Sequence, residues 1–131
     1  MKKIKHLSLF AGCGGLDLGF SWAGMETVAA VEIKQFACDT LRNNHSNIKV
    51  FGPPEYSGDI RDFNLKVLKE MIGDTEIDVI SGGPPCQPFS VAASQRFYKN
   101  DDRYIIIYMI YLLRLFLSNI ARITIYTIIN N

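Results

Sequence analysis

Short apolar runs alternate with helix-forming segments along most of the chain, and this alternation limits the possible folds more than any other feature. Strands are predicted for three apolar runs, at residues 5–10, 27–31 and 77–80. Helices are predicted between them, at residues 16–23, 34–45 and 63–73. On the second of these helices we expect Phe36, Ala37, Thr40 and Leu41 to share one apolar face. Repeated strand–helix units of this length predict an α/β fold with a mostly parallel, doubly wound sheet and right-handed crossovers.

Length, charge and cysteine usage narrow the class of protein. The chain has 131 residues and 48% hydrophobic residues, which is enough for one domain with a core. Its formal net charge of +1 gives no global basic field that would by itself indicate nucleic acid. Three widely spaced cysteines, without a CxxC pair or a histidine cluster, argue against a metal site and a disulfide framework. The amino terminus has no adequate signal-peptide core, so we expect a cytoplasmic protein.

Residues 77–90 form a strand that ends at a rigid loop with a cysteine. Gly82 and Gly83 allow a tight turn or a close approach to another molecule, and two prolines stiffen the segment that follows. Cys86 is thereby presented just beyond the carboxyl end of a strand, where ligands bind in open α/β sheets. The alternative is a buried, inert thiol, which is the usual state of a free cysteine. The order Pro-Pro-Cys-Gln-Pro-Phe-Ser favours a nucleophile.

The first predicted strand is followed by a glycine-rich turn, which is a candidate cofactor loop. Gly12 and Gly14 fit the start of a G-x-G-x-x-G fingerprint, but Asp17 stands where its third glycine would be. A tight structural turn explains this loop about as well. Glu32, at the end of the second strand, is placed to hydrogen bond ribose hydroxyls, and Asp59 is placed to accept from an adenine amino group. Either carboxylate is alternatively a helix cap or a solvated loop charge.

Together these stretches resemble the DNA cytosine-5 methyltransferases of bacterial restriction–modification systems. The matching stretches are Leu9–Leu16, Val31–Glu32, Gly58–Ile60 and Gly83–Ser90, in that family's order and near its spacing. The resemblance covers residues 4–103. It implies a Rossmann-like methyltransferase fold that uses S-adenosyl-L-methionine, incomplete here because the chain departs from the family pattern after the cysteine loop.

The resemblance also implies a role for individual residues. The implied cofactor-binding residues are Phe10, Gly12, Gly14, Gly15, Glu32, Asp59 and Ile60, with Phe10 packing on the adenosyl group. Cys86 is the implied catalytic nucleophile. The implied DNA-binding residues are Pro85, Gln87, Ser90 and Arg96. The implied substrate is double-stranded DNA with a cytosine flipped out of the helix, because a stacked base cannot reach the thiol or the methyl donor.

The chemistry of this family needs a proton donor at ring nitrogen 3 of cytosine, which its members take from a Glu-Asn-Val step after the next strand. No such step occurs in this sequence. Residues 104–131 contain no Asp, Glu, Gly or Pro and are rich in Ile and Tyr. We therefore expect residues 1–103 to be the amino-terminal part of a catalytic domain and 104–131 to be an atypical tail, in a truncated or frame-shifted chain.

The tail is predicted to form a helix at residues 105–117 and an extended segment at 123–129. The alternative, a membrane anchor, is disfavoured because the apolar stretch is shorter than the roughly 20 residues that span a bilayer. Without cover from this tail, the strand ending at Ile80 would be an exposed apolar edge, so marginal solubility is expected. Three functions stay open: a methyltransferase in fragment form, a non-catalytic half that needs a complementary carboxyl-terminal chain, and an inert remnant.

Overall fold

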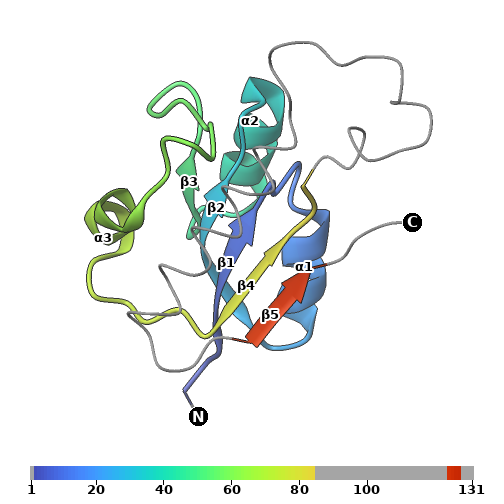
Figure 1. Ribbon diagram of the computed structural model, residues 1–131. Coiled ribbons are helices and arrows are strands. Elements are labelled where there is room, and N and C mark those ends of the chain that lie inside the picture. The colour runs from blue at the N-terminus through green and yellow to red at the C-terminus, as the bar shows by residue number, and fades with distance from the viewer. Residues whose placement is uncertain (1, 85–123, 128–131) are drawn as a thin grey trace, which may run out of the picture.

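The computed structural model describes residues 2–84 and 124–127, and within them the chain forms a parallel sheet flanked by helices (Figure 1). The strands are β1 (Lys5–Leu9), β2 (Glu26–Val31), β3 (Lys49–Phe51), β4 (Val79–Gly82) and β5 (Thr124–Thr127). The helices are α1 (Gly15–Trp22), α2 (Gln35–Asn44) and α3 (Leu65–Ile72). The strand order across the sheet is β3-β2-β1-β4-β5, and every neighbouring pair is parallel. The doubly wound parallel sheet predicted from the sequence is confirmed.

The helices cover both faces of the sheet, and the change of face falls between β1 and β4. The chain moves outward from β1 to β2 to β3 with α1 and α2 on one face, then returns with α3 on the other face to form β4 (Figure 1). The strand order therefore reverses direction at the β1–β4 pair. In open α/β sheets, ligands bind beyond the carboxyl ends of the strands at this reversal.

The two faces of β1 differ in chemistry because side chains alternate along a strand. Leu7 and Leu9 point to the α3 side and belong to the main apolar core. The buried members of this core are Leu7, Leu9, Ala29, Val31, Phe51, Ile60, Phe63, Leu68, Ile77 and Ile80. His6 and Ser8 lie on the opposite face, where they are buried together with Thr27 and Ser81. The sheet is thus apolar toward α3 and locally polar toward α1.

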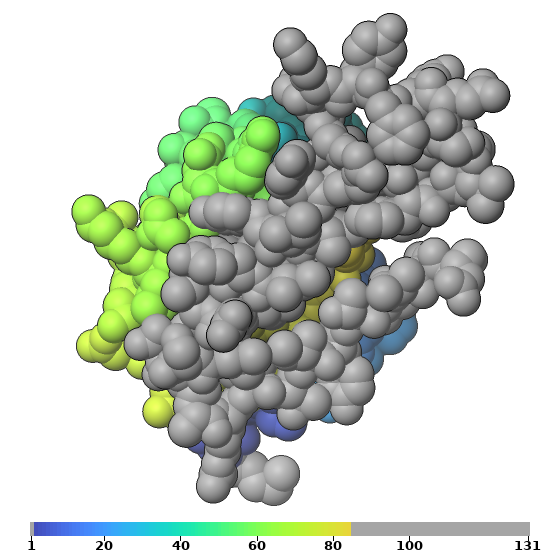
Figure 2. Space-filling model, viewed as in Figure 1, coloured from blue at the N-terminus to red at the C-terminus, as the bar shows by residue number. Residues whose placement is uncertain are grey.

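Helix α3 follows the pattern that its sequence predicts. The side chain of Asn64 accepts a hydrogen bond from the N–H of Val67 at 3.1 Å, which caps the amino terminus. Gly73 ends the helix with φ of 65°, a conformation that glycine adopts without a steric penalty. Leu68 is buried in the core between these ends. Residues of α3 and of the loop before it, coloured yellow-green, form one flank of the visible surface in Figure 2.

Helix α2 forms where it is predicted but buries a different set of residues. Its buried side chains are Ala37, Cys38 and Leu41. Ala37 and Leu41 of the expected face are buried, but Phe36 is 69% exposed, so its place on that face was wrong. Cys38 takes an inner position instead, and its thiol donates to the carbonyl of Glu32 at 3.2 Å.

Two strands were misjudged from the sequence. The three-residue strand β3 was not predicted, and it lies beside β2 with Val31 opposite Phe51. Strand β4 begins and ends two residues later than expected, because Ser81 and Gly82 pair with Ser8 and Leu9 of β1.

The carboxyl-terminal strand β5 pairs with β4, with Val79 opposite Thr124. It lies inside the segment for which an extended conformation was expected, and it covers the side of β4 that faces away from β1. The predicted helix at 105–117 and the boundary at residue 103 lie outside the described residues. Within the described part of the chain, no helix is long and apolar enough to cross a membrane.

Candidate functional site

The predicted cofactor residues gather at the carboxyl ends of β1 and β2, beside the end of β4. The loop 10–15 leaves β1 there, and Glu32 directly follows β2. Gly82, the last residue of β4, pairs with Leu9, the last residue of β1, so the segment that leads to Cys86 starts next to the glycine loop. This is the edge and the strand reversal at which α/β sheets bind ligands.

The glycine loop makes a tight turn that uses left-handed backbone conformations. Phe10, Gly12 and Gly14 have φ of 54°, 58° and 87°. A Cβ on Gly14 would lie 2.7 Å from a methyl carbon of Leu41, so Gly14 lets α1 and α2 pack closely. A Cβ on Gly12 or on Gly15 would meet no atom of the described residues within 4 Å. The loop is therefore a structural turn at Gly14 and open for the approach of a ligand at Gly12 and Gly15.

Glu32 holds the glycine loop through its carboxylate. Its Oε2 accepts the backbone N–H of Gly12 at 2.8 Å, and its Oε1 accepts the backbone N–H of Lys34 at 2.8 Å. Only 8% of this residue is exposed, so it is not a solvated loop charge. An ionised carboxylate has about four acceptor positions, so each oxygen can still accept a hydroxyl hydrogen bond. The arrangement joins the loop after β1 to the start of α2.

The loop that contains Asp59 packs directly on the backbone of Glu32. A Cβ on Gly58 would lie 2.1 Å from the carbonyl oxygen of Glu32, and Gly58 has φ of 71°. The Asp59 carboxylate accepts the backbone N–H of Arg61 at 2.9 Å and pairs with the guanidinium of the same residue. This hydrogen bonding to Arg61 lowers the pKa of Asp59, so the carboxylate stays ionised. Ile60 is 4% exposed, and its side chain belongs to the main core rather than to the surface of the site.

Two residues at this edge were missed by the sequence reasoning. Ile33 follows Glu32 and is 52% exposed, which is unusual for a large apolar side chain beside a buried carboxylate. Gly52 directly follows β3, and a Cβ there would lie 2.4 Å from both the Cys38 sulfur and the Glu32 carbonyl oxygen. The signal for Ile33 was available, because an isoleucine directly after a strand-terminal glutamate has no core position to fill. No sequence signal indicated Gly52.

The cysteine loop lies largely beyond the described part of the chain. Gly83 is exposed and Pro84 is half-buried, and both continue from the end of β4. The predicted nucleophile and DNA-binding residues are outside the described residues: Pro85, Cys86, Gln87, Ser90 and Arg96. Their roles therefore stay predictions from the sequence.

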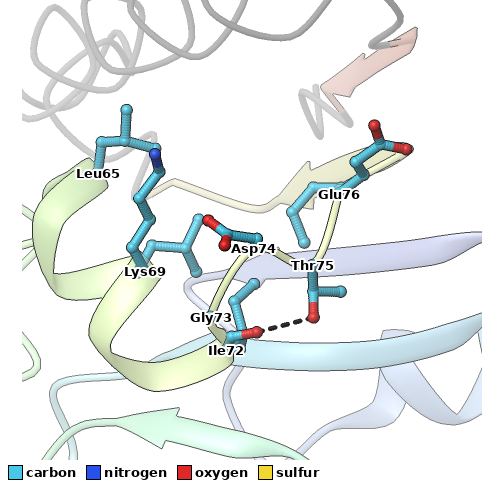
Figure 3. A pocket seen from close by; sticks show the side chains of 9 residues that line it. Leu65, Lys69, Ile72, Gly73, Asp74, Thr75 and Glu76 are labelled. Carbon is cyan, nitrogen blue, oxygen red and sulfur yellow. Dashed lines mark hydrogen bonds between the residues drawn. The ribbon is translucent and has the colours of Figure 1, made fainter.

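A separate hollow of about 220 Å³ lies between α3 and the loop that enters β4 (Figure 3). Figure 3 shows Leu65 and Lys69 of α3 across from Thr75 and Glu76. Thr75 donates its hydroxyl hydrogen to the carbonyl of Ile72 at 2.7 Å, which fixes the turn after the helix. This hollow is at the amino-terminal end of β4, the opposite end from the glycine loop.

Among residues 2–84 and 124–127, no group of three or more His, Cys, Asp or Glu could hold a metal ion.

These features define the class of protein. A parallel sheet of order β3-β2-β1-β4, a glycine loop after β1 and an acidic residue after β2 form the Rossmann-like arrangement that binds an adenosine-containing cofactor. The open space at Gly12 and Gly15, the acceptor oxygens of Glu32 and the exposed apolar side chain of Ile33 fit such a group.

Comparisons with known proteins name the family. The model of the C-5 cytosine-specific DNA methylases matches residues 4–116. The chain is 42% identical over 101 residues to Type II methyltransferase M.AquIA of Picosynechococcus sp., which covers 76% of this chain and 38% of that protein. It is 44% identical over 92 residues to Type II methyltransferase M.HindV of Haemophilus influenzae, covering 70% of this chain and 28% of that protein. The chain therefore belongs to the C-5 cytosine-specific DNA methylase family.

Solved structures agree with this assignment. A protein described as a DNA modification methyltransferase encoded within a prophage (E. coli) superposes with a TM-score of 0.71 at 27% identity, over 96% of this chain and 32% of that one. A variant of Spodoptera frugiperda DNMT2 gives a TM-score of 0.66 at 25% identity, over 96% of this chain and 36% of that one. The chain spans only about a third of the length of these relatives.

Proposed function

We propose that this chain carries the S-adenosylmethionine site and the cysteine nucleophile of a DNA cytosine-5 methyltransferase. The observation that carries the proposal is the hydrogen bond from Gly12 to Glu32, at 2.8 Å. It joins the open glycine loop after β1 to the acidic end of β2, next to the strand end that leads to Cys86. Family membership supports DNA as the substrate.

In this proposal the residues of the chain divide the binding of the cofactor. Gly12 and Gly15 admit the ligand to the backbone, and the carboxylate of Glu32 accepts hydrogen bonds from ribose hydroxyls in addition to its two backbone donors. Phe10 and Ile33 supply apolar surface for the adenosyl group. Asp59, held by Arg61, accepts from the adenine amino group. When bound, the sulfonium cofactor supplies the methyl group.

Cys86 supplies the covalent step of the proposed reaction. Its thiolate adds to carbon 6 of a flipped cytosine, which makes carbon 5 nucleophilic enough to take the methyl group. Transfer of the carbon 5 proton to water then breaks the bond between carbon 6 and sulfur, which releases the thiolate and restores the aromatic ring. Protonation at ring nitrogen 3 assists the attack, and the Glu-Asn-Val step that supplies it in the family is absent from this sequence.

A second candidate function follows from that absence. The chain would act as a cofactor-binding half that needs a complementary carboxyl-terminal chain for the proton donor and for DNA recognition. In either case little or no methyl transfer is expected from the chain alone.

Calorimetric titration with S-adenosylhomocysteine tests the cofactor site. Wild type is expected to bind, and Glu32→Ala is expected to bind at least about tenfold more weakly, because a lost hydrogen bond to a charged group has an effect of this size. Glu26→Ala is the matched control: it removes a glutamate from the other end of the same strand, where Glu26 pairs with Lys5 at 2.9 Å. Equal affinities in all three proteins would contradict the proposed site.

Methyl transfer to DNA separates the two candidate functions. The chain is mixed with the carboxyl-terminal part of a relative such as M.AquIA, and incorporation of labelled methyl groups into DNA is measured. Activity in the mixture but not in the single chain supports the split arrangement, and Cys86→Ser must abolish it. Activity of the single chain would instead contradict the need for a partner.

A further inference from the structure

Asp17 occupies the position at which a G-x-G-x-x-G fingerprint has its third glycine, and the proposed function gives it no role. The structure buries it: only 1% of Asp17 is exposed, in the first turn of α1. In the fingerprint the third glycine lets the helix pack closely on the strand. A buried carboxylate at that position must be held by specific partners, because an unpaired buried charge is costly.

The partners of Asp17 are two side chains of β1. The hydroxyl of Ser8 donates to Oδ2 of Asp17 at 3.1 Å. The second oxygen, Oδ1, is buried and has no hydrogen-bond partner among the described residues, and it lies 3.7 Å from Nδ1 of His6. His6 and Ser8 are two residues apart on the strand and therefore face the same side, toward α1. The carboxylate thus lies against both of them.

This contact closes the base of the cofactor loop. Ser8 precedes the loop and Asp17 follows it, so their hydrogen bond joins the two ends of the segment that contains Gly12, Gly14 and Gly15. The amino terminus of α1 has no side-chain cap, because its N-cap residue is Gly14. A negative charge in the first turn offsets the partial positive charge at such a helix end. Asp17 therefore attaches the start of α1 to β1 and offsets the partial positive charge of that helix end.

His6 extends the contact to the two strands that flank β1. Its Nδ1 is 2.8 Å from the hydroxyl oxygen of Thr27 on β2, and its Nε2 is 2.7 Å from the hydroxyl oxygen of Ser81 on β4. The ring also packs against Phe20 of α1, with 4.5 Å between centroids. The buried polar layer therefore connects α1 to β1, β2 and the last residues of β4.

We propose that Asp17 is a positioning residue for the cofactor loop, acting through its hydrogen bond to Ser8. This inference rests on the proposed function insofar as the loop binds the cofactor. The carboxylate replaces the close helix–strand contact of the third glycine with a polar clamp, here defined as Asp17 and Ser8. The clamp holds Gly12 where its N–H meets Glu32.

The test compares variants within the clamp with one beside it. Ser8→Ala removes the donor, and Asp17→Gly restores the third glycine of the fingerprint while removing the clamp. Asp17→Asn keeps an oxygen that can accept from Ser8. Thr27→Val is the matched control, because it deletes a buried hydrogen bond of His6 and leaves Ser8 and Asp17 in place.

Three measurements are made on each variant: S-adenosylhomocysteine affinity, amide hydrogen exchange and melting temperature. For Ser8→Ala and Asp17→Gly, S-adenosylhomocysteine affinity is expected to fall about tenfold, with faster hydrogen exchange at the amides of Gly12, Gly14 and Leu18. Asp17→Asn is expected to recover most of the affinity. Thr27→Val is expected to lower the melting temperature while leaving affinity and loop exchange within about twofold of wild type.

Three outcomes would overturn the proposal. Asp17→Gly with wild-type affinity and exchange shows that the third glycine is an adequate substitute. If Thr27→Val loses as much S-adenosylhomocysteine affinity as Ser8→Ala, the polar layer only stabilises the fold. Unchanged exchange at Gly12 and Gly14 in Ser8→Ala shows that no clamp exists, and this variant also decides the question if Asp17→Gly does not fold. If wild type binds no S-adenosylhomocysteine, the proposed function fails, and hydrogen exchange still tests the clamp.

Discussion

The carboxylate of Glu32 accepts the backbone N–H of Gly12 at 2.8 Å. The same carboxylate accepts the N–H of Lys34. The side chain that is proposed to bind ribose is therefore already fixed by two backbone donors. A preorganised acceptor of this kind loses little conformational freedom when a ligand binds.

The first prediction concerns the stability that these two hydrogen bonds provide. Glu32→Gln replaces one acceptor oxygen with an NH₂ group, which faces a backbone N–H and cannot accept from it. The free energy of unfolding is expected to fall by about 1–3 kcal/mol, measured by urea denaturation. Glu26→Gln, at the half-exposed end of the same strand, is expected to change it by less than about 1 kcal/mol. Equal effects of the two substitutions would argue that Glu32 is not held as described.

The second prediction separates steric contact from backbone strain at a glycine. Gly58 and Gly73 have similar φ values, 71° and 65°, but a Cβ on Gly58 would lie 2.1 Å from the Glu32 carbonyl oxygen, whereas one on Gly73 would meet nothing within 4 Å. Gly73→Ala is expected to cost about 1–3 kcal/mol of unfolding free energy, from a backbone conformation (φ 65°, ψ −141°) that favours glycine alone. Gly58→Ala is expected to cost roughly 3 kcal/mol or more, because a steric overlap is added.

Chemical denaturation of both variants tests that difference. Gly58→Ala is also expected to weaken S-adenosylhomocysteine binding, since the overlap would displace Glu32 or Asp59. Similar costs for the two substitutions would mean that the loop carrying Asp59 does not pack on the backbone of Glu32.

The third prediction is a loss of stability in mild acid that is caused by His6. Burial lowers the pKa of His6 below its ordinary value of 6.5, although the nearby Asp17 carboxylate opposes that effect. Below pH 6.5 the unfolded chain therefore binds more protons than the folded chain. The free energy of unfolding is expected to be fully maintained above this pH and to fall as the pH drops, with uptake of up to about one proton on unfolding.

His6→Gln provides the control for this pH dependence. Glutamine does not titrate, so the decline in unfolding free energy between pH 6.5 and pH 5 should flatten relative to wild type. Urea denaturation at several pH values gives the slope directly. An equal slope of unfolding free energy against pH in both proteins would mean that a group other than His6 causes the acid sensitivity.

The fourth prediction concerns the reactivity of two cysteines. Cys38 is buried, burial raises the pKa of its thiol, and the thiol donates to the Glu32 carbonyl at 3.2 Å. Cys13 lies exposed in the glycine loop. Iodoacetamide is expected to modify Cys13 readily and Cys38 only after unfolding in urea, because the thiolate is the reactive form. Peptide mass spectrometry identifies the modified residue, and protection of Cys13 by S-adenosylhomocysteine would support the cofactor site.

Much of the fold followed from local patterns in the sequence. Alternating apolar runs and helical spacing predicted β1, β2 and the three helices to within a few residues, and with them the parallel sheet. Gly12 and Glu32 follow consecutive strands of this sheet, and the structure brings them together at one edge. Parallel strands place their carboxyl ends together, so this part of the site depends only on topology.

The remaining features depend on contacts that a linear pattern does not contain. Strand β3 is too short to show a period, and it is held by pairing with β2. Phe36 was assigned to a buried face by its apolarity, but the smaller Cys38 fits beside Gly52, where a Cβ would lie 2.4 Å from its sulfur. The contact between Ser8 and Asp17 needed three-dimensional information, because no linear pattern places the Ser8 hydroxyl against the Asp17 carboxylate.

The pairing of Leu9 with Gly82 has a consequence for how this fold tolerates rearrangement. The glycine loop and the cysteine loop start directly after two paired residues on neighbouring strands. The register of β1 and β4, and not the polypeptide between them, therefore determines that the two loops start side by side. A circular permutant with new ends in the 53–57 turn would therefore keep both loops as neighbours. In this architecture the hydrogen bonds between paired strands, and not the order of the segments along the chain, place the two loops together.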